Sequence, residues 1–289
     1  MKDWKKVILC PNPSRDHDMC ATKTAKEILE RYGFRTVVCS PFRDQREGTF
    51  ADLDVRPLTQ ELRSADLMIT FGGDGTILHL AKLAALNKVP VLGVNTGSLG
   101  FIAELELSEL DMLCRLESWD FKTESRMMLD VSVLRDGRQV YTNLGLNDAV
   151  IREGPISHVI HLRIESDAHH LADIAGDGVI IATPTGSTAY SFSAGGPVLD
   201  AAADVVVLTP VCAHNAQVAP LVFAAGRKLE LVADAENRDT CYACADSTAQ
   251  CDLRPGDVLT VTAAPQKLQL ITFYDSEQFH AIENKLMRS

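Results

Sequence analysis

The chain has 289 residues, of which 46% are hydrophobic and 23% charged, as in a folded globular protein and not a disordered, collagen-like or coiled-coil chain. Its net charge of −11 argues against nucleic acid or an anionic membrane as a partner. No apolar run approaches the roughly 18 residues of a membrane-spanning helix, and Val7–Cys10 is too short for a secretory signal. We therefore expect a cytoplasmic protein whose eight cysteines are reduced thiols.

The first 120 or so residues alternate short apolar runs with helical patterns. Strands are expected at Val7–Cys10, Thr36–Cys39, Asp66–Phe71 and Pro90–Val94. Helices are expected at Cys20–Tyr32, Thr76–Leu86 and Ser108–Glu117, the last with Ser108 as its N-cap. This alternation indicates βαβ units and a parallel sheet.

Beyond Trp119 the pattern becomes β-rich, with one helix expected at Ser187–Ala194. Strands are expected at Met127–Leu134, Val140–Ile151, Val159–Ile164, Val179–Ala182, Val205–Leu208, Lys228–Val232, Val258–Ala263 and Leu268–Tyr274. We therefore predict an α/β protein with an α/β domain at 1–120 and a β-rich domain at 121–275. A C-terminal helix at 276–289 is expected to pack back on the first domain.

The strongest local signal is the loop Gly72-Gly73-Asp74-Gly75-Thr76, between a predicted strand and a predicted helix. Its glycines allow close approach of a ligand, and the free N–H groups of a helix start attract phosphate. Such a loop lies at the carboxyl end of a strand, where open α/β sheets bind ligands. Asp74 could hold a substrate hydroxyl or a metal ion, or could simply cap the helix, and the residues alone leave both possibilities open.

A second signal is Gly176-Asp177-Gly178, followed after a short apolar strand by the segment Thr183–Ser191 (TPTGSTAYS). Its hydroxyls and its tyrosine ring suit a nucleotide, although a turn before an ordinary amphipathic helix is equally compatible. A third is Asn147-Asp148 inside an apolar run, which is either a turn or a polar site.

The cysteines give one suggestive spacing, Cys241-x-x-Cys244 followed by Cys251. A structural zinc site needs a fourth ligand, and no second CxxC or nearby His supplies it. We therefore expect no protein-bound metal at these thiols.

Together these motifs resemble the NAD kinase family. The resemblance rests on GGDGT at Gly72–Thr76, NTGSLGF at Asn95–Phe101, the pair Asn147-Asp148 and GDGVIIATPTGSTAYSFSAGGPV at Gly176–Val198, in the family's order. GGDGT alone also occurs in lipid kinases and phosphofructokinases of the same superfamily, whereas the TPTGSTAYS segment is specific. The resemblance implies a Rossmann-like N-terminal domain, a β-rich C-terminal domain and an active site between them, in a homodimer or homotetramer.

The resemblance further implies transfer of the γ-phosphoryl group of ATP, or of polyphosphate, to the 2′-hydroxyl of the adenosine ribose of NAD, which gives NADP. Asp74 is expected to take the hydroxyl proton, and a divalent cation, Mg²⁺, to accompany ATP. The loop Gly72, Gly73, Gly75 and Thr76 is expected to hold phosphate. The residues expected to bind NAD are Asp74, Gly75, Asn147, Asp148, His158, Asp177, Thr188, Ala189, Tyr190, Ser191 and Ser193.

Four positions depart from the family pattern, all in the β-rich half: Asp148 for Glu, Ala175 for a basic residue, Ala219 for Arg, and Thr248 for Gln. These departures affect what can be expected of the affinity for the nucleotide, of the preference between NAD and NADH, and of the contacts between subunits. Two alternatives remain: a dinucleotide sensor with little turnover, and a lipid or sugar kinase of the same superfamily. The sugar or lipid kinase would leave TPTGSTAYS unexplained.

Overall fold

The computed structural model describes residues 6–41, 48–97, 100–154, 158–214, 219–235, 237 and 241–274, with 48–50 described by backbone alone. Within these residues the chain divides into two compact units. Unit 1 takes the residues up to Ser125 and those from Leu268 onwards, and unit 2 takes Arg126–Lys267. The predicted domain boundary near residue 120 and the predicted helix at 276–289 stay predictions, and the helix lies outside the described residues.

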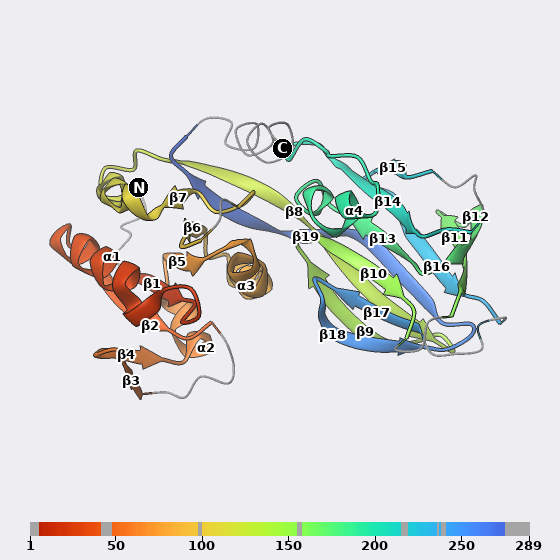
Figure 1. Cartoon of the computed structure of the whole chain (residues 1–289), viewed down its shortest axis with the longest axis horizontal. Helices are drawn as coiled ribbons and strands as arrows, with labels where there is room; N and C mark the ends of the chain where they lie inside the picture. The colour runs from red at the N-terminus through yellow and green to blue at the C-terminus, as the bar shows by residue number, and fades with distance from the viewer. Residues whose placement is uncertain are drawn as a thin grey trace. The chain divides into compact units, whose positions relative to one another are not determined.

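Unit 1 is built on parallel strands, in the order β19, β6, β5, β1, β2 and β4, with β3 antiparallel at the edge and β7 beside β6 (Figure 1). The strands are β1 (Lys6–Pro11), β2 (Arg35–Cys39), β3 (Gly48–Phe50), β4 (Leu53–Arg56), β5 (Leu67–Gly72), β6 (Val91–Asn95) and β7 (Leu105–Glu106). The helices are η1 (His17–Met19), α1 (Cys20–Arg31), α2 (Leu58–Glu61), η2 (Leu62–Ser64), α3 (Asp74–Asn87) and the 3₁₀ helix η3 (Leu107–Leu116).

Helices cover both faces of this sheet, as the continuous burial of β1, β5 and β6 requires. One face packs with α1 and η3 in a single core that includes Leu9, Ile69 and Leu92. On the other face, a Cβ added to Gly93 of β6 would stand 2.6 Å from the Cδ1 of Ile77 on α3. The predicted parallel α/β arrangement is therefore confirmed.

The N-cap predicted for the third helix is wrong. η3 begins one residue earlier, at Leu107, and its N-cap is Glu106. The Glu106 carboxylate accepts from the backbone of Glu109, while the Glu109 carboxylate accepts from the backbone N–H of Glu106, at 2.9 Å. This reciprocal capping box satisfies two N–H groups of the first turn and displaces Ser108 from the capping position.

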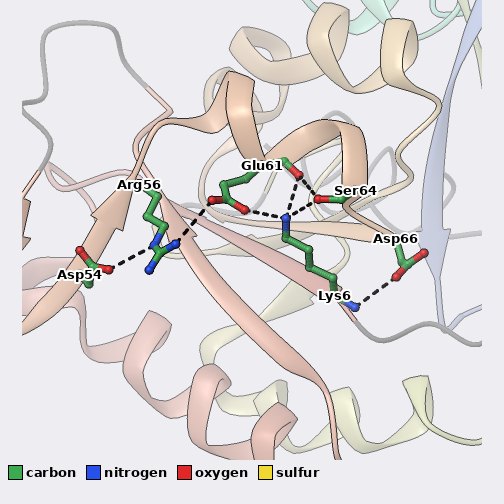
Figure 2. Close-up of polar contacts among 6 residues, drawn as sticks. All are labelled: Lys6, Asp54, Arg56, Glu61, Ser64 and Asp66. Carbon is green, nitrogen blue, oxygen red and sulfur yellow. Dashed lines mark hydrogen bonds and ion pairs between the residues drawn. The ribbon is translucent and has the colours of Figure 1, made fainter.

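The amino end of β1 is held by Lys6 (Figure 2). Its ammonium group lies 2.6 Å from the carboxylate of Glu61 and 2.6 Å from the hydroxyl of Ser64. Arg56 reaches the same Glu61 carboxylate at 3.9 Å and Asp54 at 3.2 Å. Lys6 is the first residue of β1, at the strand end away from the GGDGT loop, so we expect the network to stabilise unit 1.

Unit 2 contains two antiparallel arrangements of strands (Figure 1). One has the order β12, β11, β16 and β19, with β8 pairing both β19 and β9, and the other has the order β15, β14, β13, β10, β17 and β18. The strands are β8 (Lys122–Arg135), β9 (Arg138–Gly145), β10 (Asp148–Arg152), β11 (Ile160–Ser166), β12 (His169–Gly176), β13 (Gly178–Ala182), β14 (Val205–Val211), β15 (Leu221–Ala224), β16 (Leu229–Ala233), β17 (Cys241–Ala245), β18 (Thr248–Leu253) and β19 (Val258–Thr272).

Alternate residues of the two arrangements meet in one core, which includes Val131 of β8, Ile151 of β10 and Leu162 of β11. The opposite face of β10 and β13 is also buried, against Ala194 and Leu199. Both faces of these two strands are therefore covered, which explains why their sequences are apolar without alternation.

Four predicted elements in this half need correction, three strands and one helix. The expected strand Val140–Ile151 is two strands, β9 and β10, because the chain leaves one arrangement and enters the other between them. The two strands expected at Val258–Ala263 and Leu268–Tyr274 are one continuous strand, β19. The expected helix Ser187–Ala194 is a short 3₁₀ turn, η4 (Gly186–Thr188), and one helical turn, α4 (Tyr190–Ser193), separated at Ala189.

Candidate active site

In unit 1 the GGDGT loop lies where parallel strands end. The N–H of Asn12, after β1, donates to the carbonyl of Phe71 at 2.8 Å, and that of Thr96, after β6, to the carbonyl of Gly72 at 3.0 Å. The Asn12 side chain also donates to the Thr76 hydroxyl at 3.1 Å. A Cβ on Gly72 would stand 2.2 Å from that hydroxyl oxygen, so this position admits only glycine. The ends of β1, β5 and β6 therefore form one fixed edge.

Asp74 is the first residue of α3, and it does not cap that helix. The N-cap is Gly73, and the Asp74 carboxylate instead accepts from three backbone N–H groups of the segment after β6. These are Phe101 at 2.7 Å, Ile102 at 3.1 Å and Ala103 at 3.3 Å. A carboxylate has about four acceptor sites, so this arrangement aims Asp74 while leaving capacity for a further donor such as a hydroxyl.

Space around the loop favours backbone contact with a ligand. A Cβ placed on Gly73 or on Gly75 would meet no atom within 4 Å, and Gly75 is exposed. A Cβ on Gly100, by contrast, would stand 2.0 Å from an oxygen of Asp74. The open glycines let phosphate oxygens approach the helix start, while the closed one preserves the position of the acid.

Arg15 is a basic residue at this edge that the sequence analysis missed. It is exposed, and one guanidinium nitrogen lies 3.4 Å from where a Cβ of Gly97 would stand, so it extends over the loop after β6. The neighbouring Asp16 is buried and accepts from the N–H groups of Ala21 and Thr22, at 2.9 and 3.1 Å. The position of Arg15 directly after the first strand is the signal that could have identified it.

In unit 2 the pair Asn147-Asp148 lies where the chain passes from β9 to β10. It is not a hairpin turn, because β10 pairs with β13 and β17 and not with β9. The carbonyl of Asn147 accepts from the N–H of Thr183 at 2.9 Å, and that of Leu146 accepts from the Thr183 hydroxyl at 2.6 Å. The side-chain oxygen of Asn147 is buried and has no hydrogen-bond partner among the described residues. The polar-site alternative for this pair is therefore favoured.

A second acid, Asp246, holds this junction and was not identified from the sequence as a site residue. Its carboxylate accepts the backbone N–H groups of Leu146, Asn147 and Asp148, at 2.6, 2.8 and 3.1 Å. Burial and the charge of Asp246 raise the pKa of Asp148 from 3.8 to about 7. Burial raises the pKa of Asp246 to about 6, and the three N–H donors act in the opposite direction.

The TPTGSTAYS segment packs against the same junction. A Cβ on Gly186 would stand 2.0 Å from the carbonyl oxygen of Asn147, so the close approach requires glycine. Ser187 bonds to the carbonyl of Pro184 at 2.6 Å, and the buried Ser191 hydroxyl lies 2.8 Å from that of Thr209. These two serine hydroxyls therefore stabilise the segment itself.

The other members of the segment are more accessible. Tyr190 is 44% exposed, and the partly buried Thr188 hydroxyl donates to the carbonyl of Thr185 at 3.2 Å. Ser193 is exposed, with its hydroxyl 3.4 Å from the carbonyl of Ala189. The ring of Tyr190 is thus the largest side chain that this segment offers to a ligand.

Asp177 and His158 lie at the other end of the β10–β13 ladder from Asp148. The register pairs Asp148 with Ala182 and Arg152 with Gly178, which puts the two ends roughly 14 Å apart at about 3.4 Å per residue. The carbonyl of Asp177 accepts from the N–H of Glu153 at 3.0 Å, and the carboxylate of Glu153 accepts from the N–H of His158 at 2.9 Å. The expected nucleotide-binding residues of unit 2 therefore form two groups.

No group of three or more His, Cys, Asp or Glu side chains suited to a metal ion occurs within the described part of the chain. Cys241 and Cys244, despite their CxxC spacing, belong to the cores on opposite faces of β17. No helix in the described residues is long and apolar enough to cross a membrane.

Of the positions 175, 219 and 248, which depart from the family pattern, only Thr248 makes hydrogen bonds through its side chain among the described residues. The Thr248 hydroxyl accepts from the amide of Asn143 at 3.0 Å and donates to the carbonyl of Ala245 at 2.8 Å. Ala175 of β12 accepts at its carbonyl from the N–H of His214, at 2.8 Å. Ala219 is exposed, and residues 215–218 before it lie outside the described residues.

Comparisons with known proteins agree with these motifs. The family model of the ATP-NAD kinase N-terminal domain matches residues 15–115, and that of the ATP-NAD kinase C-terminal domain matches residues 146–273. An NAD kinase of Clostridium botulinum is 33% identical over 99% of this chain and 96% of its own length. An NAD kinase of Symbiobacterium thermophilum is 37% identical over 94% of this chain and 96% of its own.

Solved structures share the fold. Yeast NADH kinase, in complex with NADH, has a TM-score of 0.84 at 24% identity, over 98% of this chain and 87% of its own. An NAD kinase from Archaeoglobus fulgidus, in complex with ATP, has a TM-score of 0.74 at 23% identity, over 98% of both chains. With both family domains matched in order and relatives above 30% identity along almost the whole length, this chain belongs to the NAD kinase family.

Proposed function

We propose that this protein transfers the γ-phosphoryl group of ATP to the 2′-hydroxyl of the adenosine ribose of NAD, and so produces NADP. The observation that carries the proposal is the aimed carboxylate of Asp74, held by three backbone N–H groups beside open glycines at a helix start. An oriented acid next to phosphate-binding N–H groups is what transfer to an alcohol requires.

Residues of unit 1 can then be assigned to proton transfer and to phosphate binding. The ribose oxygen forms a bond to the γ-phosphorus while the bond from that phosphorus to the bridging oxygen of ADP breaks, and Asp74 takes the hydroxyl proton. Because the transition state is loose, the proton leaves late and a carboxylate is a sufficient base. The N–H groups of Gly73 and Gly75 hold phosphate, while the N–H of Thr76 donates to the carbonyl of Gly73 at 2.9 Å. The donor enters as Mg-ATP, whose Mg²⁺ offsets negative charge that this acidic chain cannot neutralise.

The dinucleotide is bound chiefly by unit 2. Asn147 offers a buried amide oxygen without a partner among the described residues, and Tyr190 offers a ring against which a base can lie. Asp148 meets a ribose hydroxyl. The remaining contacts are assigned to Gly75, His158, Asp177, Thr188, Ala189 and Ser193, while the buried hydroxyl of Ser191 supports the segment through Thr209.

Formation of NADP, read through an NADP-specific dehydrogenase, tests the proposal. Purified protein with Mg-ATP is expected to convert NAD and to leave diacylglycerol and sugar phosphates unchanged. The same assay with NADH in place of NAD identifies the preferred phosphoryl acceptor. The assay with polyphosphate in place of ATP identifies the preferred donor. Calorimetric binding of NAD without any NADP formed would identify a sensor and contradict the kinase. Residence in the cytoplasm and assembly into a homodimer or homotetramer remain predictions.

A further inference from the structure

The turn between β17 and β18 contains a carboxylate that acts on the Asn147-Asp148 junction. Asp246 is 9% exposed, its carboxylate accepts three successive backbone N–H groups from the junction, and its own N–H donates to the carbonyl of Asp148 at 3.0 Å. The residues that it joins are 98 to 100 positions away along the chain. Charge-assisted hydrogen bonds of this kind are roughly twice as strong as neutral ones, so Asp246 fixes the backbone that presents Asn147 and Asp148.

The side chain of Asp148, unlike that of Asp246, is not surrounded by hydrogen-bond donors in the described structure. It is 6% exposed, and no described residue donates a hydrogen bond to its carboxyl group. The groups that face it are Asp246 and Cys244 of the β17–β18 hairpin and Tyr190 of α4, while Arg152 acts on Cys244 and Tyr190. None of these stabilises a negative charge on Asp148 as the three N–H groups stabilise one on Asp246.

Two buried carboxyl groups this close do not both ionise readily, because each charge raises the energy of the other. The N–H donors decide which group keeps the charge. They favour ionised Asp246, which leaves the proton of the pair on Asp148. The raised pKa of Asp148, about 7, is the higher of the two and agrees with this assignment.

We propose that Asp246 is a positioning residue for the nucleotide, which fixes the Asn147-Asp148 junction and keeps Asp148 protonated, so that Asp148 donates a hydrogen bond to the ribose. The inference rests on the proposed function, since it assumes that NAD is bound at this junction. A neutral carboxyl group offers one donor and one acceptor to a hydroxyl, whereas a carboxylate only accepts. Loss of the proton therefore weakens NAD binding.

Calorimetry of NAD binding between pH 6 and pH 8.5, without ATP, tests the position of the proton. The Kd of the parent protein is expected to rise up to tenfold per pH unit above pH 7, and Asp148→Asn is expected to remove this dependence. The exposed Asp252→Asn on the same hairpin is the matched control and is expected to keep it. A Kd of the parent that is constant with pH, or a dependence that persists in Asp148→Asn, would overturn the proposal.

Infrared spectroscopy gives a readout independent of binding. A protonated carboxyl band is expected at pH 6.5 in the parent and in Asp252→Asn, and is expected to be absent from Asp148→Asn. A band unchanged in Asp148→Asn would place the proton elsewhere and overturn the proposal.

Kinetics test the positioning role. Asp246→Asn is expected to raise the KM for NAD at least tenfold at pH 6.5, with the KM for ATP and kcat within about threefold of the parent, a split that general misfolding does not produce. Equal losses in all three parameters would contradict positioning.

If Asn147→Ala leaves the Kd for NAD unchanged, the nucleotide is elsewhere and this inference fails. If NAD binds with the expected pH dependence but no NADP forms, the inference stands and the kinase assignment fails.

Discussion

Two carboxylates in this protein are each held by three backbone N–H groups, one in each unit, and their surroundings differ. Asp74 in unit 1 is partly buried, and its three N–H donors fix its carboxylate beside Gly73 and Gly75, where an added Cβ would meet no atom within 4 Å. Asp246 in unit 2 is buried beside a second acid, Asp148, and its three N–H donors belong to the junction between β9 and β10. We propose that the same arrangement of three N–H donors orients the reacting group in unit 1 and positions a nucleotide-binding segment in unit 2.

Gly100→Ala, which fills the space beside Asp74, is expected to lower kcat more than any change described below at Asp148 or Lys6. In Gly100→Ala the new methyl carbon would stand 2.0 Å from an Asp74 oxygen, so the carboxylate has to move. A displacement of about 1 Å commonly costs about 10²-fold in rate, and we expect kcat for NADP formation to fall by about that factor. Gly97→Ala, whose methyl would meet only the Arg15 guanidinium at 3.4 Å, is the control and should stay near the parent. Equal kcat values in the two variants would contradict an aimed Asp74.

The buried pair in unit 2 predicts a pH-dependent stability. The folded pKa of Asp148 is raised from 3.8 to about 7, so its contribution is fully present below pH 3.8 and is lost as the pH rises to about 7. The unfolding free energy of the parent should therefore fall, relative to Asp148→Asn, by about 2.5 kcal/mol between pH 5 and pH 8, at about 1.4 kcal/mol per unit of pKa shift. Urea denaturation at both pH values measures this, with Asp252→Asn as the control. A difference between parent and Asp148→Asn that is independent of pH would show that Asp148 is ionised throughout.

The smallest effect is expected away from both carboxylates, at the Lys6 network (Figure 2). Lys6→Met removes three hydrogen bonds to Glu61 and Ser64 but leaves Arg56 near the Glu61 carboxylate. We expect a loss of about 1 kcal/mol in unfolding free energy and an unchanged kcat at temperatures where the protein is folded. A tenfold fall in kcat would connect the amino edge of the sheet to the chemistry, against the present account.

Local pattern was sufficient to predict β1, β5 and β6 and the helices α1 and α3, since their apolar periodicity and glycine signals are contained in the segments themselves. The short helices α2 and η2 were not predicted. The break between β9 and β10 was not predictable, because Leu144-Gly145-Leu146 reads as part of one apolar run. Its cause is non-local: the acid that holds the junction comes from the turn after β17. The single strand β19 was divided in the prediction at Pro265, which lacks the N–H that a strand interior normally provides.

The same distinction applies to the site. The GGDGT and TPTGSTAYS segments can be recognised from the sequence alone, because glycines and hydroxyl groups are concentrated in a few residues. The partners of Asp74 are 27 to 29 residues away, and those of Asp246 about 100, so neither set of N–H donors could be read from spacing. From the sequence, Asp74 could have been either a helix cap or a ligand-binding acid. Its hydrogen bonds to Phe101, Ile102 and Ala103, and the position of Gly73 as the N-cap, exclude the helix cap.

Asp74 is proposed to take the proton of the ribose hydroxyl, and the rate of the Asp74→Asn variant is the decisive test of that role. The new amide keeps one acceptor but faces the N–H groups of Phe101–Ala103 with a donor, so about 1–3 kcal/mol of stability is expected to be lost. The rate of NADP formation is therefore measured at saturating Mg-ATP and NAD, at a temperature where circular dichroism shows the variant folded, beside the exposed control Asp111→Asn. We predict a fall in kcat of about 10²–10⁴-fold for Asp74→Asn and none for the control. A variant that keeps more than about a third of the parental kcat would contradict the assignment of Asp74 as the base.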